Sequence, residues 1–303
     1  VLVAGATGYL GKYVTREFKR RGYWVRVLVR RKSLRKLDEA GPFLEPAIRE
    51  YVDDVFVGEV TDIASLEGCC DGIDVIFSSI GITRQREGFS FMDVDYRGNL
   101  NLLRAAVRSG VEKFIFVSVF NQHLLAELEV GRAREMVVRE LERSGIDYTV
   151  IRPTGFFSDA SELLRMALSG RVYLVGEGDA RINPIHGEDL ARVCVDADEG
   201  GEREVPVGGP DVYTYREMAE LAFSVVGREP RITRIPPTLA RLLVEAFRPL
   251  GGRYYTLARF VLIAMQNDFV APPTGTHHLG DYYRELLPRL RERRSGLLRL
   301  PRG

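Results

Sequence analysis

The feature that most constrains the fold is a glycine triplet that directly follows an apolar run at the start of the chain. Val1–Ala4 has the composition of a short strand, and Gly5, Gly8 and Gly11 follow at spacings of three. The first glycine permits a tight turn, the second lets backbone amides approach a pyrophosphate, and the third lets a helix lie close to the strand. The amino end of such a helix also attracts anions. The pattern therefore predicts a strand, a turn that binds a dinucleotide, and a helix.

Similar short apolar runs recur along the first half of the chain, separated by segments long enough for helices. The predicted strands are Val1–Ala4, Trp24–Val29, Val55–Val57, Val75–Ser78, Phe114–Ser118 and Tyr148–Arg152, and the predicted helices are Tyr9–Arg21, Tyr96–Arg108 and Val130–Glu142. Parallel strands joined by right-handed crossover helices follow from this alternation. We predict an α/β fold, a Rossmann-type doubly wound parallel sheet, with ligands at the carboxyl ends of its strands.

After about Gly155 the rhythm changes to a helix over Asp159–Leu168, short strands, and turns rich in proline and glycine. We predict a dinucleotide-binding domain over residues 1–155 and a smaller α+β substrate region over residues 156–303, which interleaves with the end of the sheet. The tail Arg284–Arg302 has seven arginines against two glutamates, and Pro288 and Gly296 are expected to interrupt any helix. We expect this tail to be a solvated, partly frayed end of the chain.

Composition narrows the class of protein. The 303 residues include 43 Lys and Arg against 42 Asp and Glu, so no whole-chain field favours a nucleic-acid backbone. Cys69, Cys70 and Cys194 form neither a disulfide framework nor a zinc-ligand spacing. No apolar run approaches the roughly 20 residues that span a bilayer. A strand begins at once, so we expect no cleaved leader, and a cytoplasmic location fits best.

The end of the second strand indicates which dinucleotide is bound. A free ribose 2′-hydroxyl would be met there by Asp or Glu, whereas this chain has Arg30, Arg31 and Lys32. Cationic forks suit a 2′-phosphate, which favours NADP(H) over NAD(H). The alternative is a solvated basic run, since Lys12–Lys36 holds eleven basic residues and one acidic residue.

These residues carry a family resemblance that covers nearly the whole chain. The chain resembles the atypical and extended short-chain dehydrogenase/reductase superfamily, in particular its divinyl chlorophyllide reductase-like and epimerase-like members. Besides the glycine triplet, the matching segments are Gly58–Asp62, Ser78–Gly81, Val94–Asn99, Phe116–Ser118, Ile151–Phe157, Ile182–Leu190 and Val207–Pro210.

The resemblance implies further cofactor contacts. Thr7, Tyr9 and Leu10 would line the diphosphate turn. Glu59 and Val60 would border the adenine, and Ser79 and Ile80 would lie beside the linked riboses. The remaining implied contacts, near the nicotinamide, are Pro153, Gly155 and Phe156. Taken singly, Val60, Ile80, Pro153 and Phe156 fit core or strand-end roles equally well.

The catalytic pattern of the superfamily is missing. Most members use a Tyr and a Lys four residues later to protonate a reduced carbonyl, but this chain has Val130 and Arg134 at those positions. As a permanent cation, Arg134 is expected to bind ribose or phosphate, but it is a poor proton donor. Ser118 remains as a residue that orients a substrate. His123, Tyr148 and Tyr255 are other donors that no spacing singles out.

The remaining histidines suggest structural roles. His186 precedes the acidic start of a helix, where it satisfies a backbone bond rather than carrying protons. His277 and His278 lack a third ligand at a sensible spacing, and we predict no metal site.

Two functions are compatible with these features of the sequence. The first is an NADPH-dependent reductase of a small or apolar organic substrate, with a C=C bond as an alternative to a carbonyl as the reduced group, under a lid from Phe156, Phe157 and Pro236–Met265. The second is a non-catalytic NADP(H)-binding redox sensor or an assembly subunit, like the superfamily member associated with respiratory complex I. We expect a monomer or homodimer and no nucleic acid. The amphipathic segment Pro237–Phe247 leaves contact with a membrane surface open, beside a lid or oligomer contact.

Overall fold

The computed structural model describes residues 1–82, 88–246, 248 and 252–294. Within them the central layer is a parallel seven-stranded sheet of order β3-β2-β1-β4-β5-β6-β9. Its strands are β1 (Leu2–Ala4), β2 (Arg26–Val29), β3 (Asp54–Val57), β4 (Val75–Ser78), β5 (Lys113–Val117), β6 (Asp147–Pro153) and β9 (Glu204–Val207). The predicted doubly wound Rossmann-type sheet is confirmed.

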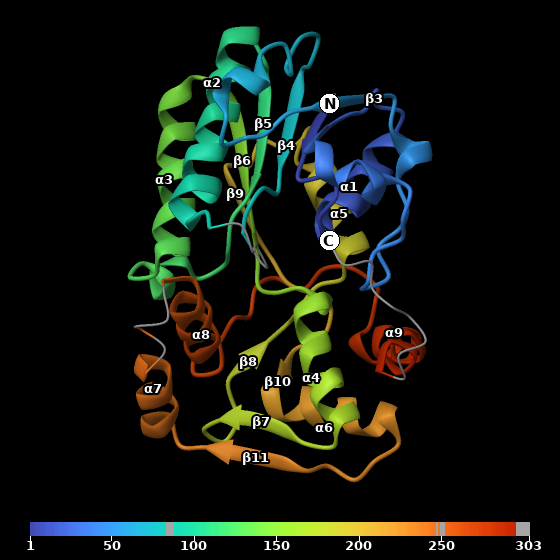
Figure 1. The fold of residues 1–303 in the computed structure, drawn as a ribbon, viewed down its shortest axis with the longest axis vertical. Helices are drawn as coiled ribbons and strands as arrows, with labels where there is room; N and C mark the ends of the chain where they lie inside the picture. The colour runs from blue at the N-terminus through green and yellow to red at the C-terminus, as the bar shows by residue number, and fades with distance from the viewer. Residues whose placement is uncertain (83–87, 247, 249–251, 295–303) are drawn as a thin grey trace.

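Helices cover both faces of the sheet (Figure 1). One face carries α1 (Tyr9–Arg20) and α5 (Gly187–Asp196), and the other carries α2 (Asn99–Ser109) and α3 (Glu129–Ser144). Each face encloses its own apolar core, with Phe18 and Phe77 in the first and Phe114 and Phe116 in the second. The strand order reverses between β2-β1 and β4-β5, which creates a crevice at the carboxyl ends of β1 and β4.

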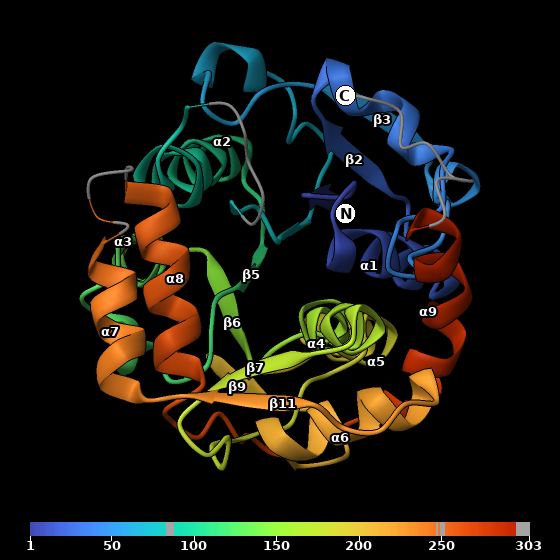
Figure 2. The ribbon, with the colours of Figure 1, turned by 60° about the horizontal axis from the view of Figure 1, so that its bottom comes forward.

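A second, smaller layer lies at the end of the sheet where the Gly155–Phe156 connection leaves β6 (Figures 1 and 2). Its elements are α4 (Phe157–Ser169), β7 (Val172–Val175), β8 (Arg181–Ile182), β10 (Tyr213–Thr214), α6 (Tyr215–Val226), β11 (Ile232–Ile235), α7 (Pro237–Ala246), α8 (Gly252–Ala264) and α9 (Leu279–Arg294). Helices α4, α6 and α9 share a third apolar core. The chain returns to the sheet in between, with α5 and β9.

Three local predictions need correction. Helix α9 runs through Pro288, because Leu286, Leu287 and Leu290 are buried on its inner side and offset the lost backbone bond. The tail is therefore packed up to Arg294, and residues 295–302 lie outside the described residues. The helix expected at Tyr96 begins earlier, as a π-helical segment η4 (Met92–Gly98). Strand β2 begins at Arg26 rather than Trp24, whose side chain is 48% exposed.

Candidate cofactor and active site

The glycine turn has the tight geometry that its sequence predicts. Gly5 has a φ of +90°, and the Gly8 amide donates to the Gly5 carbonyl at 2.9 Å. A Cβ on Gly11 would lie 2.1 Å from the Gly5 carbonyl oxygen, so only glycine lets α1 pack this closely. Gly8 precedes α1 without any side-chain cap. The turn thus presents the amino end of α1 at the carboxyl end of β1.

The loop after β4 closes one side of this turn. Its first residue, Ser79, donates its amide to the Ala4 carbonyl at 3.1 Å, and a Cβ on Gly5 would lie 2.8 Å from the Ser79 hydroxyl. Ile80 and Val60 are both buried, and Val60 packs beneath Gly98 of η4. The structure therefore brings the segments that follow β1 and β4 into contact.

The cationic segment follows β2, the neighbour of β1. The parallel register pairs Ala4 with Leu28, so β1 and β2 end at the same edge of the sheet and Arg30 directly follows β2 there. Arg31 and Lys32 are exposed at the start of the short helix η1 (Arg31–Leu37), and Arg30 is half-buried. The cationic segment thus leaves the sheet at the same edge as the glycine turn.

Phe156 links the smaller layer to the glycine turn. Its ring meets the Tyr9 ring edge-on, with centroids 5.8 Å apart. The backbone beside it is fixed, because the Ile185 amide donates to the Gly155 carbonyl at 2.8 Å. The Tyr9 hydroxyl accepts a hydrogen bond from the Gly187 amide at 3.1 Å, and burial raises the pKa of Tyr9. Leu10 is buried in the core of the α1 face.

Arg134, at the position of the missing lysine, is held by two partners. Its Nη1 donates to the Val117 carbonyl at 2.7 Å, and its Nη2 lies 3.0 Å from Oδ1 of Asp95. The other carboxylate oxygen of Asp95 accepts from the Ile82 amide at 2.9 Å. Asp95 is fully buried, and this burial raises its pKa although Arg134 acts in the opposite direction.

Close approach to the loop after β4 fixes the guanidinium of Arg134 further. A Cβ on Gly81 would lie 2.3 Å from Nη2 of Arg134. Val130, at the position of the missing tyrosine, is half-buried against the core of the α2–α3 face. The valine side chain has no proton that it could donate to a substrate.

Ser118, directly after β5, joins a buried polar network. Its hydroxyl accepts from Arg152 Nη1 at 3.3 Å and lies 3.4 Å from Glu135 Oε1. Arg152 is almost fully buried and also pairs with Glu135 at 2.7 Å and with Glu204 at 2.9 Å. The network ties β5, β6, β9 and α3 together at the carboxyl end of the sheet.

The other donors considered from the sequence lie apart from the turn. Tyr148 stands near the start of β6, at the opposite end of the sheet, with the Arg203 guanidinium 4.6 Å from its ring centroid. The Tyr255 hydroxyl donates to Glu245 at 2.9 Å within the α7–α8 hairpin. His123 is exposed in the short helix η5 (Gln122–Leu125).

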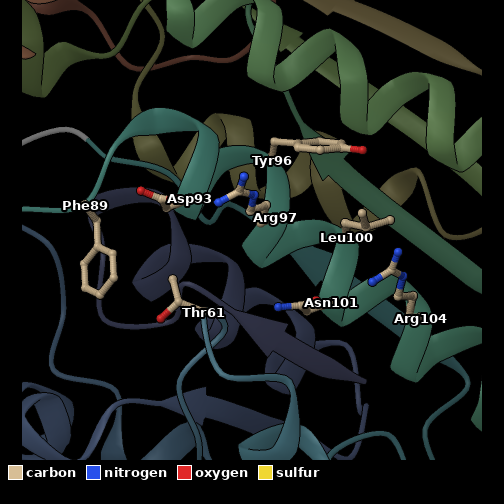
Figure 3. Close-up of a pocket in the computed structure, with 8 residues that line it drawn as sticks. All are labelled: Thr61, Phe89, Asp93, Tyr96, Arg97, Leu100, Asn101 and Arg104. Atoms are coloured by element: carbon tan, nitrogen blue, oxygen red, sulfur yellow. Dashed lines mark hydrogen bonds and ion pairs between the residues drawn. The ribbon is translucent and has the colours of Figure 1, made fainter. Parts of the chain in front are cut away.

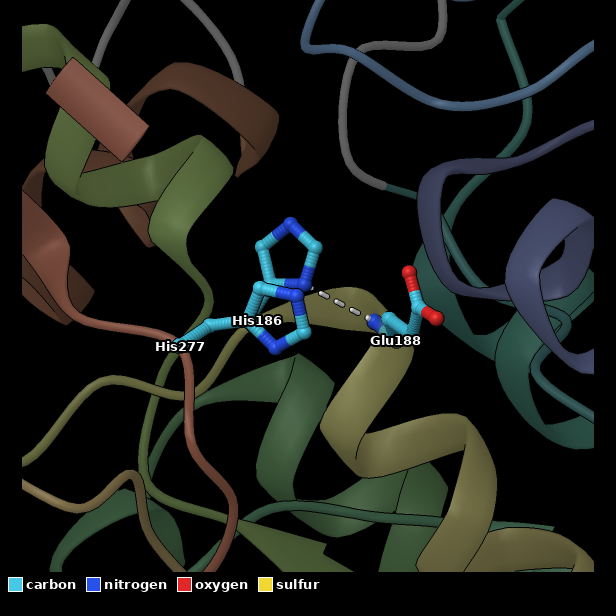
Figure 4. A group of neighbouring side chains, drawn as sticks. All are labelled: His186, Glu188 and His277. Carbon is cyan, nitrogen blue, oxygen red and sulfur yellow. Dashed lines mark hydrogen bonds between the residues drawn. The ribbon is translucent and has the colours of Figure 1, made fainter. Parts of the chain in front are cut away.

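His186 caps α5 as predicted. Its Nδ1 accepts from the Glu188 amide at 3.2 Å (Figure 4). Its ring also contacts Tyr13, Phe157 and Tyr282. Burial, with a smaller contribution from His277, lowers the pKa of His186 to about 4. The ring is therefore neutral near pH 7.

Among the described residues, ligand atoms of His186, Glu188 and His277 come within 4.8 Å of one another. Two of these ligands are already engaged, because His186 Nδ1 caps the helix and the Glu188 carboxylate pairs with Arg16 at 2.7 Å. The rings of His186 and His277 are stacked, with centroids 4.2 Å apart, so their in-plane lone pairs do not converge. This arrangement is that of a packed aromatic cluster.

A surface groove of about 470 Å³ borders the loop after β3 (Figure 3). Its lining residues come mainly from η4 and α2: Thr61, Phe89, Asp93, Tyr96, Arg97, Leu100, Asn101 and Arg104. Asn101 donates to the Val60 carbonyl at 2.9 Å, so the groove adjoins the predicted adenine side. Thr61, Tyr96 and Arg97 lie in segments that carry the family resemblance, but none of the lining residues was predicted as a site residue.

Comparison with known proteins assigns the family. The NAD(P)H-binding family model matches residues 5–198, from the glycine turn to the end of α5. The chain belongs to this NAD(P)H-binding family. It is also 30% identical to divinyl chlorophyllide a 8-vinyl-reductase, chloroplastic, of Oryza sativa subsp. indica, over 95% of this chain and 78% of that protein. The predicted resemblance to atypical short-chain dehydrogenases/reductases is confirmed.

Two further similarities show the breadth of the family. Photosystem II assembly factor Ycf39 of Synechocystis is 26% identical to this chain, over 80% of this chain and 72% of the length of Ycf39. The Escherichia coli NADPH-dependent quinone oxidoreductase QOR2, solved with NADPH, superposes with a TM-score of 0.70 at 19% identity, covering 94% of this chain and 99% of that one. The sequence relatives thus include a protein named as an assembly factor, and the QOR2 structure shows a shared fold.

The hydrogen-bond and ion-pair partners that hold Ser118 and Arg134 were not predicted from the sequence. Asp95 meets Arg134, and Arg152 meets Glu135 and Ser118, only in the folded chain, because these contacts join separate elements. In the part of the chain that the structure describes, no helix is both long and apolar enough to cross a bilayer.

Proposed function

We propose that the chain is an NADPH-dependent reductase of a small or apolar organic substrate. The observation that carries the proposal is the meeting of three segments at the carboxyl end of β1. They are the glycine turn, the cationic end of β2, and Phe156 against Tyr9.

The residues around the turn fit a phosphorylated dinucleotide. The cradle at Gly5, Gly8 and Gly11 has no room for a Cβ at Gly11, and its open amides suit a diphosphate. In the proposal Thr7, Tyr9 and Leu10 line that turn. Arg30 and Arg31 hold the 2′-phosphate with their guanidinium forks, and Lys32 adds a point charge. The further cofactor contacts are Glu59 and Val60 at the adenine, Ser79 and Ile80 at the riboses, and Pro153, Gly155 and Phe156 at the nicotinamide.

Reduction of a C=C bond fits the site better than reduction of a carbonyl. A bound nicotinamide supplies a hydride, and carbonyl reduction also needs a proton delivered to the developing oxyanion. Val130 has no proton to donate, and Arg134 is a permanent cation that is fixed by Val117 and Asp95. When an activated C=C bond is reduced, hydride adds to one carbon and a proton from water adds to the other. A relative at 30% identity is named as a vinyl reductase, which supports this choice.

We assign Ser118 and Arg134 as positioning residues. Ser118 lies in the Arg152–Glu135 network at the end of β5, and Arg134 connects α3 to the loop after β4. Both therefore set the spacing of the strand ends on which the nicotinamide and the substrate would rest.

Isotope transfer tests the proposal. The protein is incubated with NADPH deuterated at its transferable position and with a metabolite extract, and mass spectrometry identifies any metabolite that gains deuterium. Label in a reduced C=C bond is the expected result. Tight NADPH binding with no transfer from either face would overturn the reductase.

The alternative is an NADP(H)-binding sensor or assembly subunit. Loss of both the Tyr and the Lys favours it, as does the relative named as an assembly factor. It predicts NADPH binding without turnover and a change in partner binding between NADPH and NADP⁺. A cytoplasmic location, the monomer or homodimer, and the lack of nucleic-acid partners remain predictions.

A further inference from the structure

Helices α7 and α8 form a hairpin at one side of the smaller layer (Figure 1). Its exposed aliphatic side chains are Leu239, Leu242 and Leu243 on α7 and Leu257 and Val261 on α8, here called the hairpin face. Leu242 is 67% exposed and Leu257 is 52% exposed. The spacings of three and four residues place the members from each helix on one side of that helix. Such a concentration of exposed aliphatic side chains marks a contact surface.

The hairpin face is not part of the fold's own packing. In α7, whose residues are all described, Ala240 is the buried residue. Helix α8 contacts η5, and its Arg259 lies 3.6 Å from Glu127, which follows η5 in the chain. Among the described side chains of α8, Thr256 and Leu262 are buried, whereas Leu257 and Val261 are exposed. Folding therefore leaves these leucines to another partner.

The charge around the hairpin face is positive. Residues 237–265 contain four arginines and a single carboxylate, Glu245, although the whole chain is nearly neutral. Arg241 and Arg248 are exposed, and Glu245 is satisfied within the hairpin by the Tyr255 hydroxyl at 2.9 Å. The hairpin thus combines exposed aliphatic side chains with cations, the composition of helices that lie in a membrane interface.

We propose that the hairpin face docks on an anionic lipid surface. The leucines enter the boundary between headgroups and acyl chains, and Arg241 and Arg248 contact the phosphate layer. A second copy of this chain fits less well, because a symmetric contact would oppose the same arginines. A protein partner fits less well too, since the face consists of Leu and Val rather than the aromatic anchors typical of such interfaces.

Vesicle flotation tests the proposal directly. The full chain is mixed with vesicles of equimolar phosphatidylcholine and phosphatidylglycerol, and separately with vesicles of phosphatidylcholine alone. We expect binding to the anionic vesicles that weakens with salt. L242S/L257S is expected to reduce that binding by about tenfold or more, and R241E/R248E by about fivefold per arginine.

Val107→Ser is the matched control, because Val107 is 49% exposed on α2, in the other layer. It should bind vesicles like the unchanged chain, and thermal unfolding should show that all variants are folded. Absence of binding to anionic vesicles at low salt would overturn the proposal. Equal binding by L242S/L257S would do so as well, as would a dimer in solution that this variant dissociates. None of these outcomes depends on NADPH binding or turnover.

Discussion

The ring of Tyr9, in the glycine turn, meets the ring of Phe156, at the entry to the smaller layer, edge-on at a centroid distance of 5.8 Å. This contact joins two segments that are nearly half the chain apart. It places the predicted nicotinamide end of the site directly against the predicted diphosphate turn.

Phe156→Ala is expected to weaken NADPH binding by about tenfold, since it removes an aromatic pair and opens the junction between turn and smaller layer. Fluorescence titration with NADPH measures the change. Tyr173→Ala is the control, because Tyr173 is 49% exposed on β7. If both variants bound NADPH like the unchanged chain, Phe156 would lie outside the cofactor site.

Gly11→Ala tests the cradle. The added Cβ would lie 2.1 Å from the Gly5 carbonyl oxygen, so we expect a loss of about 2–3 kcal/mol in the free energy of unfolding, together with loss of NADPH binding. Gly22→Ala is the contrast. Gly22 has a φ of +88° but open space around its Cα, so its substitution should cost about 1 kcal/mol and leave NADPH binding intact. Urea unfolding distinguishes steric from conformational strain, and equal costs would contradict the packing argument.

The Asp95–Arg134 pair is expected to be structural and strongly coupled. Asp95→Asn leaves the Arg134 guanidinium without a counter-charge beside a fully buried position, so we expect a loss of about 2–3 kcal/mol in unfolding free energy. Asp93→Asn, a partly exposed neighbour, should cost less than about 1 kcal/mol. Similar small losses in both variants would show that Arg134 does not depend on Asp95.

His186 makes stability depend on pH. Its pKa is lowered from 6.5 to about 4, so the unfolded chain binds more protons than the folded chain between these values. Its contribution, about 3 kcal/mol, is fully present above pH 6.5 and is lost as the pH falls towards 4. His186→Asn keeps a helix-capping acceptor and should flatten this part of the stability profile. His123→Asn, at an exposed site, should not, and a profile unchanged by His186→Asn would refute the assignment.

The sheet could be predicted because its signals are local. The glycine triplet and the alternation of apolar runs depend on neighbours in sequence, and they placed β1, α1 and the cations after β2 correctly. The prediction for Pro288 failed because burial of Leu286, Leu287 and Leu290 against α4 and α6 outweighs a local helix breaker. That burial becomes visible only once the third core is assembled.

The candidate site could be predicted only in part for the same reason. The turn at Gly5 follows from the glycine motif, whereas the ring contact of Phe156 with Tyr9 and the partners of Ser118 and Arg134 involve distant elements. Asp95 gave no signal as a partner because a carboxylate near a helix start ordinarily faces solvent.

The most direct test of the central claim is a calorimetric titration of the chain with NADPH and with NADH. We expect NADPH to bind more tightly than NADH. We also expect R30A/R31A to weaken NADPH binding by about tenfold to a hundredfold while leaving NADH nearly unchanged, because the guanidinium contacts are to the 2′-phosphate. R35A/K36A, which removes two exposed cations of the same helix, should change neither. Equal affinity for the two cofactors, or equal losses in R30A/R31A, would contradict the central claim.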